Sequence, residues 1–342
     1  MGVPGNLQTT AMAVMPHRDV DRALEIALSL DVPFWPQLPL VSYYEDMYVQ
    51  ASENFPGIVL DMENRTLRFS MDKFAEELEQ ALSRFDDAAF FDISTTYSVV
   101  YHRFLREAGL ADRPAIRGQL EGPVSFGLNV HDQDDRPLIF NDEVRPFMLE
   151  FMARRVSVQL ARLKELNPNA FMFVDEPGLQ FIFSGLSGYG DVVAKADMEM
   201  FFSLIDRPRG VHLCGNPDWD FLLGLDLDVL SLDMYSNGER FVSYVRSIRR
   251  FLDRGGILIW GIVPTNFEPF ANESIDSIDG RLEELWTALD RSGIDKGYLL
   301  SRSMLSPATC CLVNPDGEVT VEKAFAAIQA LSERLRERYR LY

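Results

Sequence analysis

The sequence predicts an α/β protein built as a single (β/α)8 TIM barrel, with a β-hairpin and helices inserted after the second strand. Short apolar runs alternate with amphipathic helical stretches along the 342 residues, and eight parallel strands with intervening helices form the closed barrel. The length fits, because such a barrel takes about 250 residues or more. No Ser/Gly-rich linker or break in composition divides the chain, so we expect residues 1–342 to form one domain.

Eight apolar runs are the predicted strands, at residues 9–15, 32–38, 115–120, 170–174, 210–214, 229–232, 257–261 and 297–301. The helix after the first strand carries one apolar stripe, because its apolar residues recur at intervals of three and four positions. This stripe consists of Val20, Ala23, Leu24, Ala27 and Leu28. Further helices are predicted at residues 142–166, 194–205, 278–291 and 321–338.

Residues 39–110 interrupt the alternation and are predicted to be the insertion. Two strand-like runs, at residues 58–61 and 66–69, flank Asn64-Arg65, which indicates a β-hairpin. Helices are expected at residues 71–85 and 95–108. An open, doubly wound sheet is the alternative to the barrel, but no Gly-x-Gly-x-x-Gly follows the first strand and no Gly-rich lysine loop is present, so no motif supports nucleotide binding.

The charge excludes some classes of partner. With 33 Lys and Arg against 52 Asp and Glu, the net charge is −19, which opposes binding to nucleic acid or to an anionic membrane. No apolar run approaches the roughly 20 residues that span a bilayer, and residues 1–16 do not have the pattern of a signal peptide. Three cysteines are too few for a disulfide framework, so we expect a cytoplasmic protein with reduced thiols.

A candidate metal site lies at the predicted strand ends. His212 and Cys214 are two residues apart on a strand and therefore point to the same face, and both residue types bind zinc well. Asp233 ends the next strand, and Cys310 and Cys311 follow the last one. Because side chains at the carboxyl ends of barrel strands converge on one mouth, these residues form a sensible Zn²⁺ ligand set. The alternatives are a helix cap for Asp233 and core packing for the cysteines.

Two acidic residues at other strand ends are candidates for substrate binding. Asp175, followed by Glu176-Pro177, could hold a substrate ammonium group; the alternative is the acidic start of a helix. Glu121, followed by Gly122-Pro123, ends the third predicted strand; alternatively it is an ordinary carboxylate in a loop.

A zinc site of this kind could serve two chemistries. A thiol bound to zinc loses its proton and stays nucleophilic at neutral pH, whereas zinc-bound water could instead carry out hydrolysis.

Together these motifs resemble the cobalamin-independent methionine synthase family. His212-Leu213-Cys214-Gly215 resembles the His-x-Cys zinc motif of that family, and Asp175-Glu176-Pro177 resembles its Ile-Asp-Glu-Pro segment. Residues 120–125 are similar to its Gly-Pro-Val-Thr turn, and Cys310-Cys311-Leu312 is similar to its Cys-Gly-Leu motif. Asp233 stands where the family carries a zinc-ligating Glu. The motifs occur in the family's order over essentially the whole chain.

The resemblance implies the barrel of the uroporphyrinogen decarboxylase and methionine synthase superfamily, corresponding to the C-terminal, catalytic barrel of the two-barrel enzymes. It implies zinc held by His212, Cys214, Asp233 and Cys310, and a thiol, typically homocysteine in methionine biosynthesis, that attacks a methyl group. It also implies that Asp175 holds the amino group of the substrate.

The chain departs from the family pattern at three places. Met12-Ala13-Val14 replaces the family's Ile-Gly-Ser, whose Ser binds the amino-acid end of the substrate. Residues 261–266 contain no counterpart of the family's catalytic His, and the Glu-Arg-Asn-Asp-Met segment is reduced to residues 43–47. Without that His, a methylcorrinoid on a partner corrinoid protein suits the chain better as methyl donor than methyl-folate, because reduced cobalt leaves without a proton.

Other functions remain open at this stage. A uroporphyrinogen decarboxylase-like enzyme needs no metal, but it must hold a polycarboxylate and would leave His212 and Cys214 without a role. A corrinoid-to-thiol methyltransferase of a methylotrophic pathway would use a different thiol. A metal-binding barrel protein without catalysis is the alternative outside the enzymes.

Overall fold

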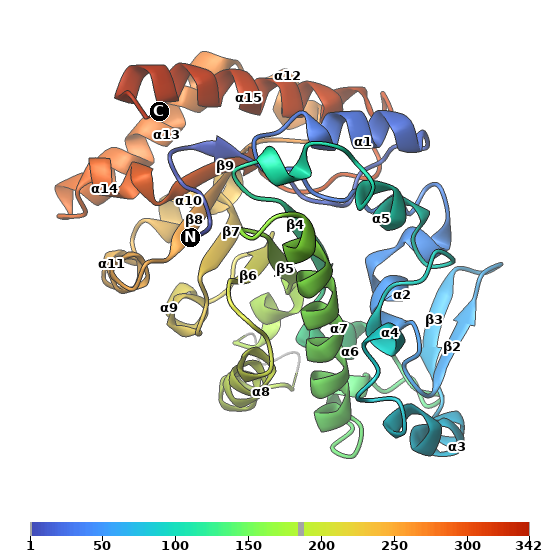
Figure 1. The fold of residues 1–342 in the computed structure, drawn as a ribbon. Coiled ribbons are helices and arrows are strands. Elements are labelled where there is room, and N and C mark those ends of the chain that lie inside the picture. Colours follow the sequence, from blue (N-terminus) through green and yellow to red (C-terminus); the bar gives the residue numbers. More distant parts are fainter. Residues whose placement is uncertain (1, 184–187, 342) are drawn as a thin grey trace.

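The computed structural model describes residues 2–183 and 188–341, which form a curled parallel sheet surrounded by helices (Figure 1). Seven strands pair in the order β1-β9-β8-β7-β6-β5-β4. They are β1 Gln8–Thr9, β4 Arg117–Glu121, β5 Phe171–Asp175, β6 Arg209–Leu213, β7 Val229–Asp233, β8 Ile257–Val263 and β9 Ser303–Pro307. The regular sheet is therefore a partial barrel of the TIM type, and the expected closure by eight regular strands is not observed.

The gap between β1 and β4 is filled by residues 32–38, the predicted second strand. This segment makes isolated parallel bridges on both sides, Val14 with Gln37 and Phe34 with Arg117, and Val32 donates a backbone hydrogen bond to Thr9. It contains Pro33 and Pro36, which have no backbone N–H to donate. The prolines explain why the segment occupies the position of a strand without forming a continuous ladder.

The predicted last strand, residues 297–301, is wrong. These residues form helix α14 Lys296–Ser301, and the strand β9 begins two residues later. Asp295 caps the helix, since its carboxylate accepts a hydrogen bond from the Tyr298 amide at 2.7 Å. A short apolar run does not distinguish a buried strand from a short buried helix, and here the cap selects the helix.

Helices cover the outside of the sheet. The α-helices are α1 Val20–Leu28, α2 Met47–Ser52, α3 Met71–Leu82, α4 Ala88–Phe91, α5 Val99–Phe104, α6 Pro123–Asn129, α7 Arg145–Leu166, α8 Asp191–Ser203, α9 Trp219–Gly224, α10 Met234–Phe241, α11 Val245–Asp253, α12 Phe267–Ala271, α13 Ile275–Arg291 and α15 Val319–Tyr339, besides α14. Short 3₁₀ helices are η1 Tyr43–Glu45, η2 Leu110–Asp112, η3 Leu138–Phe140 and η4 Pro177–Phe181. Within residues 2–183 and 188–341, no helix combines the length and the apolar character needed to cross a membrane.

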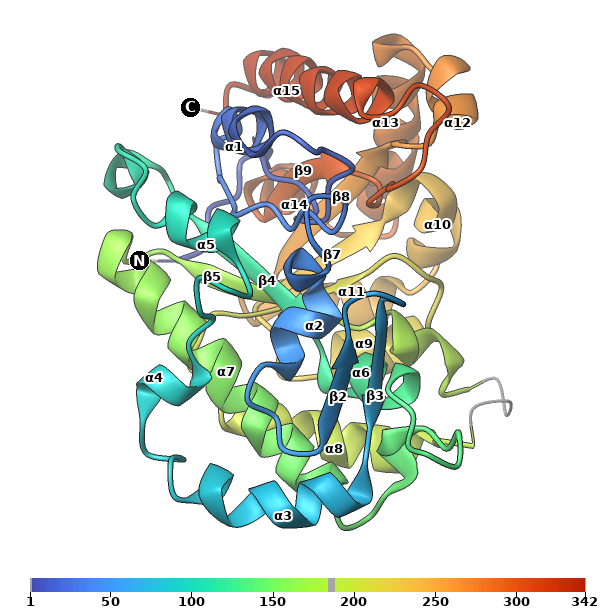
Figure 2. The same cartoon turned by 90° about the vertical axis from the view of Figure 1, so that its right-hand side faces the viewer.

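The inserted hairpin is confirmed at the predicted residues. Strands β2 Ile58–Asp61 and β3 Thr66–Phe69 pair antiparallel, with Ile58 opposite Phe69. The segment from α2 through α5 lies to one side of the sheet, with the hairpin facing the viewer in Figure 2. It packs on α7 through aromatic contacts; the ring of Phe55 lies 5.5 Å from that of Phe147 and 5.1 Å from that of Phe151.

A separate apolar cluster identifies the residues that face the barrel interior. Its members come from the strands and the segments that adjoin them, and none comes from a helix: Met12, Val32, Ala115, Phe171, Phe173, Val229, Ile257, Ile259 and Met304. Because strand residues two apart share a face, Asp175 on β5 and Ser231 and Asp233 on β7 also face inward. This alternation places polar side chains above the apolar layer, at the carboxyl ends of the strands.

Candidate active site

Three of the predicted site residues lie side by side across neighbouring strands. Glu121 on β4 is in register with Asp175 on β5, and Asp175 is in register with His212 on β6. His212 is in turn in register with Ser231 on β7. Asp175 therefore lies on the strand adjacent to β6, which carries His212 and is followed by Cys214.

His212 is neutral and oriented by a neighbour. Its side chain is buried, and its Nδ1 lies 3.1 Å from the hydroxyl oxygen of Ser231. Burial lowers the pKa of His212 to about 3, and the Arg117 guanidinium contributes in the same direction. With Nδ1–H donating to Ser231, the Nε2 lone pair would be available to a metal ion, as in metal sites whose second ring nitrogen is held by a hydrogen bond.

The thiols of Cys214 and Cys310 share a neighbour. Cys214 follows β6 and Cys310 follows β9, and the Thr309 side chain lies close to both thiols, with its hydroxyl donating to the Cys310 carbonyl oxygen at 3.4 Å. Both residues are exposed to solvent, but the protein atoms that surround the sulfur atoms raise the pKa of both thiols, that of Cys310 to about 12. Because the thiolates of Cys214 and Cys310 would repel each other, both thiols are protonated at neutral pH without a bound cation.

Cys311 lies in a different environment. It is buried in the hydrophobic core, and its thiol donates a hydrogen bond to the carbonyl oxygen of Val313 at 3.4 Å. Core packing, one of the alternatives raised for the cysteine pair, thus describes Cys311, whereas Cys310 lies near Cys214.

Asp233 acts as a helix cap. Its Oδ1 accepts a hydrogen bond from the Ser236 amide at 3.0 Å at the start of α10, and burial raises its pKa. Among the residues that the structure describes, no three His, Cys, Asp or Glu side chains are arranged to hold a metal ion. The four predicted ligands are of the right chemical type, but they would have to move toward an ion to bind it.

A polar chain inside the barrel positions Asp175. Gln119 donates a hydrogen bond to Asp175 at 2.5 Å, and its amide oxygen accepts bonds from the Ala13 amide and from Arg117, both at 3.0 Å. Arg117 also donates to the hydroxyl of Thr10 at 2.9 Å. Burial raises the pKa of Asp175 to about 7, while the hydrogen bond from Gln119 and the charge of Arg117 oppose this rise.

Arg117 is the one cation in this chain of contacts. It is fully buried, and its guanidinium lies 4.8 Å from the ring centre of Phe34 and 4.5 Å from that of Phe173. Burial lowers its pKa to about 9. One of its nitrogens, Nη2, has no hydrogen-bond partner, so the charge is only partly compensated by protein groups.

Glu121 contacts the insertion. The Tyr48 side chain of α2 lies next to its carboxyl group, and Asn129 donates to the Tyr48 hydroxyl at 2.6 Å. Burial, together with the charges of Asp175 and Glu176, raises the pKa of Glu121 well above its usual value. Tyr48 also lines a pocket of about 580 Å³ beside the hairpin, so it connects this pocket with the strand ends.

Glu176 holds the loop after β4 in place. Its two carboxylate oxygens accept hydrogen bonds from the amides of Val124 and Ser125, at 2.9 and 2.8 Å, and from the Ser125 hydroxyl. Burial raises its pKa to about 7, although these hydrogen bonds favour the charged form. Glu176 therefore occupies the amino end of α6, where a bound anion would otherwise be stabilised.

The sequence contained a signal for part of this network. Arg117, Gln119 and Glu121 alternate along one strand, and strongly polar residues at every second position of a buried barrel strand indicate a polar interior. No sequence pattern indicated a role for Tyr48, because it lies near Glu121 only once the insertion has folded against the barrel. The remaining histidines lie elsewhere: His17 is buried 3.4 Å from Glu322, and His102 and His131 bind backbone carbonyls.

The chain resembles proteins of known structure in its fold. No family model matches the sequence, and no curated protein matches it either. The chain is similar in structure to a B12-independent methionine synthase from Shewanella sp. W3-18-1 solved with selenomethionine, with a TM-score of 0.57 and 12% identity over 98% of each chain. It is also similar to a methyltransferase from Methanosarcina mazei, with a TM-score of 0.57 and 15% identity over 98% of this chain and 94% of the other. At these identities the likeness establishes a methionine synthase-like fold for the chain.

Proposed function

We propose that this protein is a zinc-dependent methyltransferase that activates a thiol at the carboxyl ends of the barrel strands. The observation that carries the proposal is the proximity of the Cys214 and Cys310 thiols to each other and to Asp175, which is in register with His212 on the adjacent strand. The likeness in fold to a methionine synthase and a methyltransferase supports it.

Zn²⁺ would be held by His212, Cys214, Asp233 and Cys310. A neutral imidazole, two thiols and a carboxylate are ligands that zinc accepts, and a bound zinc ion would lower the pKa of a substrate thiol so that it is a thiolate at neutral pH. Asp233 would be the weakest ligand, since its carboxylate also caps α10.

The protein's own carboxyl groups would hold the polar end of the substrate. Asp175 faces the barrel interior next to His212, and Glu121 lies beside Asp175 on the next strand; Gln119 fixes the orientation of Asp175. Homocysteine is the acceptor that the family resemblance suggests, and related thiols are equally compatible with the sulfur chemistry.

The proposed methyl donor is a methylcorrinoid carried by a partner corrinoid protein. The carbon–sulfur bond forms as the carbon–cobalt bond breaks, and the electron pair stays on cobalt, so no proton donor is required. Since the chain carries a charge of −19, such a partner would present a neutral or basic docking face.

Metal analysis of purified variants tests the ligand set. We expect one zinc per chain, lost in Cys214→Ser and Cys310→Ser and retained in the matched control Cys311→Ser. Absence of zinc, or a normal zinc content in Cys214→Ser, would contradict the proposal. Loss in Cys311→Ser alone would exchange the roles of the two neighbours.

Methyl-transfer assays test the donor. Methylcobalamin and methyl-folate are each offered with homocysteine and with other thiols, and thioether formation is followed. We expect transfer from the corrinoid and little from methyl-folate. Efficient use of methyl-folate refutes the donor assignment, and failure with both donors favours the non-catalytic metal-binding alternative.

A uroporphyrinogen decarboxylase-like activity has less support. A polycarboxylate substrate needs cations around it, whereas Glu121, Asp175 and Glu176 gather at the strand ends and Arg117 is buried beneath them.

A further inference from the structure

We infer that the acceptor is a thiol that carries an ammonium group and no carboxylate, and that the ammonium binds between Glu121 and Asp175. The inference rests on the proposed function for the sulfur end of the substrate, and on the geometry of these two residues for the other end.

Glu121 and Asp175 present unused acceptor atoms. Oε1 of Glu121 and Oδ1 of Asp175 are buried and have no hydrogen-bond partner, and the residues are only 1% and 8% exposed. They lie on adjacent strands in direct register and face the barrel interior. A buried acceptor without a partner is costly, and an ammonium group, with three donors and one positive charge, would satisfy both oxygens at once.

The donors that a carboxylate would require are already engaged. The Ala13 amide, at the end of the segment that follows β1, donates to Gln119. The amides of Val124 and Ser125, at the start of α6, donate to Glu176. Two backbone positions that could receive an anion are thus occupied by side chains of the protein.

Arg117, the cation on the same strand as Glu121, is poorly placed to receive a carboxylate. Arg117 lies four residues before Glu121 on β4, which corresponds to about 13 Å along the strand. It is enclosed by Phe34 and Phe173, and two of its nitrogens bind Thr10 and Gln119. A substrate carboxylate at the level of Glu121 would instead meet Asp175 and Glu176, and like charges at close range repel.

Binding of an ammonium should release a proton. The carboxyl group of Glu121 faces Asp175 and Glu176 from β5 and the residue after it, and Tyr48 and Asp46 from the insertion. These neighbours and burial raise the pKa of Glu121, and a bound cation lowers it again. The pKa of Asp175 is also raised, to about 7, so the contribution of Glu121 is the difference in proton release between the natural chain and a Glu121 variant, measured with an amine that has no thiol.

Calorimetric titration of the zinc-loaded protein with four probes tests the inference. The probes are cysteamine, homocysteine, 3-mercaptopropionate and n-propylamine, the last of which has an ammonium group and no sulfur. We expect cysteamine to bind at least about tenfold more tightly than homocysteine, and 3-mercaptopropionate to bind most weakly. In buffers of different ionisation enthalpy, cysteamine and n-propylamine should both release protons.

The variant Glu121→Gln should weaken the binding of n-propylamine and cysteamine by about ten- to a hundredfold and lower the number of protons that n-propylamine releases on binding. Glu143→Gln, at an exposed glutamate elsewhere, is the matched control and should change neither. Equal or tighter binding of homocysteine would overturn the inference and indicate a carboxylate site at Arg117. Unchanged binding in Glu121→Gln would also overturn it. If n-propylamine binds as expected but sulfur adds no affinity, the ammonium site stands and the proposed thiol activation fails.

Discussion

At the scale of single residues, Asp175 links the candidate metal ligands to the polar chain inside the barrel. It is in register with His212, while Gln119 fixes its other side. Its carboxylate can hold a charged substrate group without being a ligand of the ion. The distinction between substrate binding and metal binding is therefore open to test.

The variant Asp175→Asn should retain zinc and weaken substrate binding. The side chain keeps its shape and can still accept the hydrogen bond from Gln119, but it loses the charge. Loss of one charged hydrogen bond costs about 1.5–3 kcal/mol, or roughly ten- to a hundredfold in affinity. Zinc content and thiol titration check this; zinc loss, or unchanged binding, would count against the assignment.

The variant Glu121→Gln should make stability less dependent on pH. The pKa of Glu121 is raised in the folded protein, whereas in the unfolded chain it is near 4.3. As pH rises above that value the unfolded state loses the proton first, so Glu121 reduces stability progressively until its folded pKa is passed. At pH 8 we expect Glu121→Gln to be more stable than the natural chain by about 1–3 kcal/mol, with the gain disappearing near pH 4.

Urea unfolding at pH 4.5 and pH 8 measures this difference. The control Glu143→Gln should leave the pH profile unchanged. A Glu121→Gln protein that is less stable than the natural chain at pH 8 would show that Glu121 is charged and compensated.

At the scale of helices and strands, the sequence predicted the centre of the sheet better than its ends. Strands β4 to β8 and the hairpin lie within two residues of their predicted ranges, because their apolar runs are bounded by turn residues. Residues 32–38 occupy the place of a predicted strand but form only isolated bridges, because Pro33 and Pro36 interrupt the ladder. Helices such as α9 and α12 have six and five residues, which is too short for a periodic pattern to be recognised.

The residues of the candidate site also differ in how well the sequence predicts them. The side chains at strand ends could be identified, because the end of a barrel strand fixes where its residues gather. Their partners could not, since the contacts of Tyr48 with Glu121 and of Thr309 with both thiols depend on how distant segments meet. For Asp233 the sequence could not separate two roles, because the same carboxylate caps α10 and is a candidate zinc ligand.

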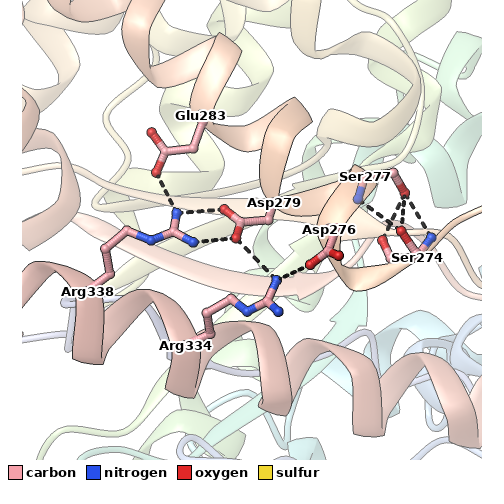
Figure 3. A network of polar contacts seen from close by, with 7 residues as sticks. All are labelled: Ser274, Asp276, Ser277, Asp279, Glu283, Arg334 and Arg338. Atoms are coloured by element: carbon pink, nitrogen blue, oxygen red, sulfur yellow. Dashed lines mark hydrogen bonds and ion pairs between the residues drawn. The ribbon is translucent and has the colours of Figure 1, made fainter.

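The packing of α13 against α15 gives a prediction for these elements. Asp279 of α13 accepts hydrogen bonds from both terminal nitrogens of Arg338, at 2.8 and 2.6 Å, and a longer one from Arg334 at 3.5 Å (Figure 3). Asp279 is 6% exposed. The variant Asp279→Asn should lower the free energy of unfolding by about 1.5–3 kcal/mol, because it weakens a paired, mostly buried carboxylate.

Asp276 provides the matched control on the same helix. It also binds Arg334, at 2.6 Å, but its side chain is 84% exposed. Exposed ion pairs contribute about 0–1 kcal/mol, so Asp276→Asn should have little effect. Urea unfolding of both variants measures the contrast, and equal losses would mean that burial does not govern this network.

At the scale of the whole molecule, the two ends of the chain meet in the barrel. β1 pairs with β9, and the Ser332 hydroxyl of α15 donates a hydrogen bond to the Leu7 carbonyl at 2.6 Å. The insertion is tied to the same body by α7. These contacts support the prediction that residues 1–342 form one domain, which a test of cooperativity can decide.

Arg155 of α7 connects the barrel to the insertion, and its substitution provides the test. It is fully buried, donates to the Glu53 carbonyl in the insertion, and lies 3.8 Å from the Glu53 carboxylate. Removing one partner of a buried ion pair costs about 3–5 kcal/mol, so Arg155→Met should destabilise the protein by that amount. Arg162→Met, on the same helix with a partly exposed partner, should cost about 0–1 kcal/mol.

If the chain is one domain, Arg155→Met should shift every unfolding probe together. All four tryptophans, Trp35, Trp219, Trp260 and Trp286, lie outside residues 39–110, so their fluorescence reports on the barrel. Hydrogen exchange of the β2 and β3 amides reports on the insertion. We expect both signals to move to the same lower urea concentration, because unfolding of the insertion would expose the apolar side of α7 and the Tyr48 contact with Glu121. Loss of protection in the hairpin at a urea concentration that leaves the tryptophan signal unchanged would instead make the insertion a separate folding unit, able to open beside the candidate active site.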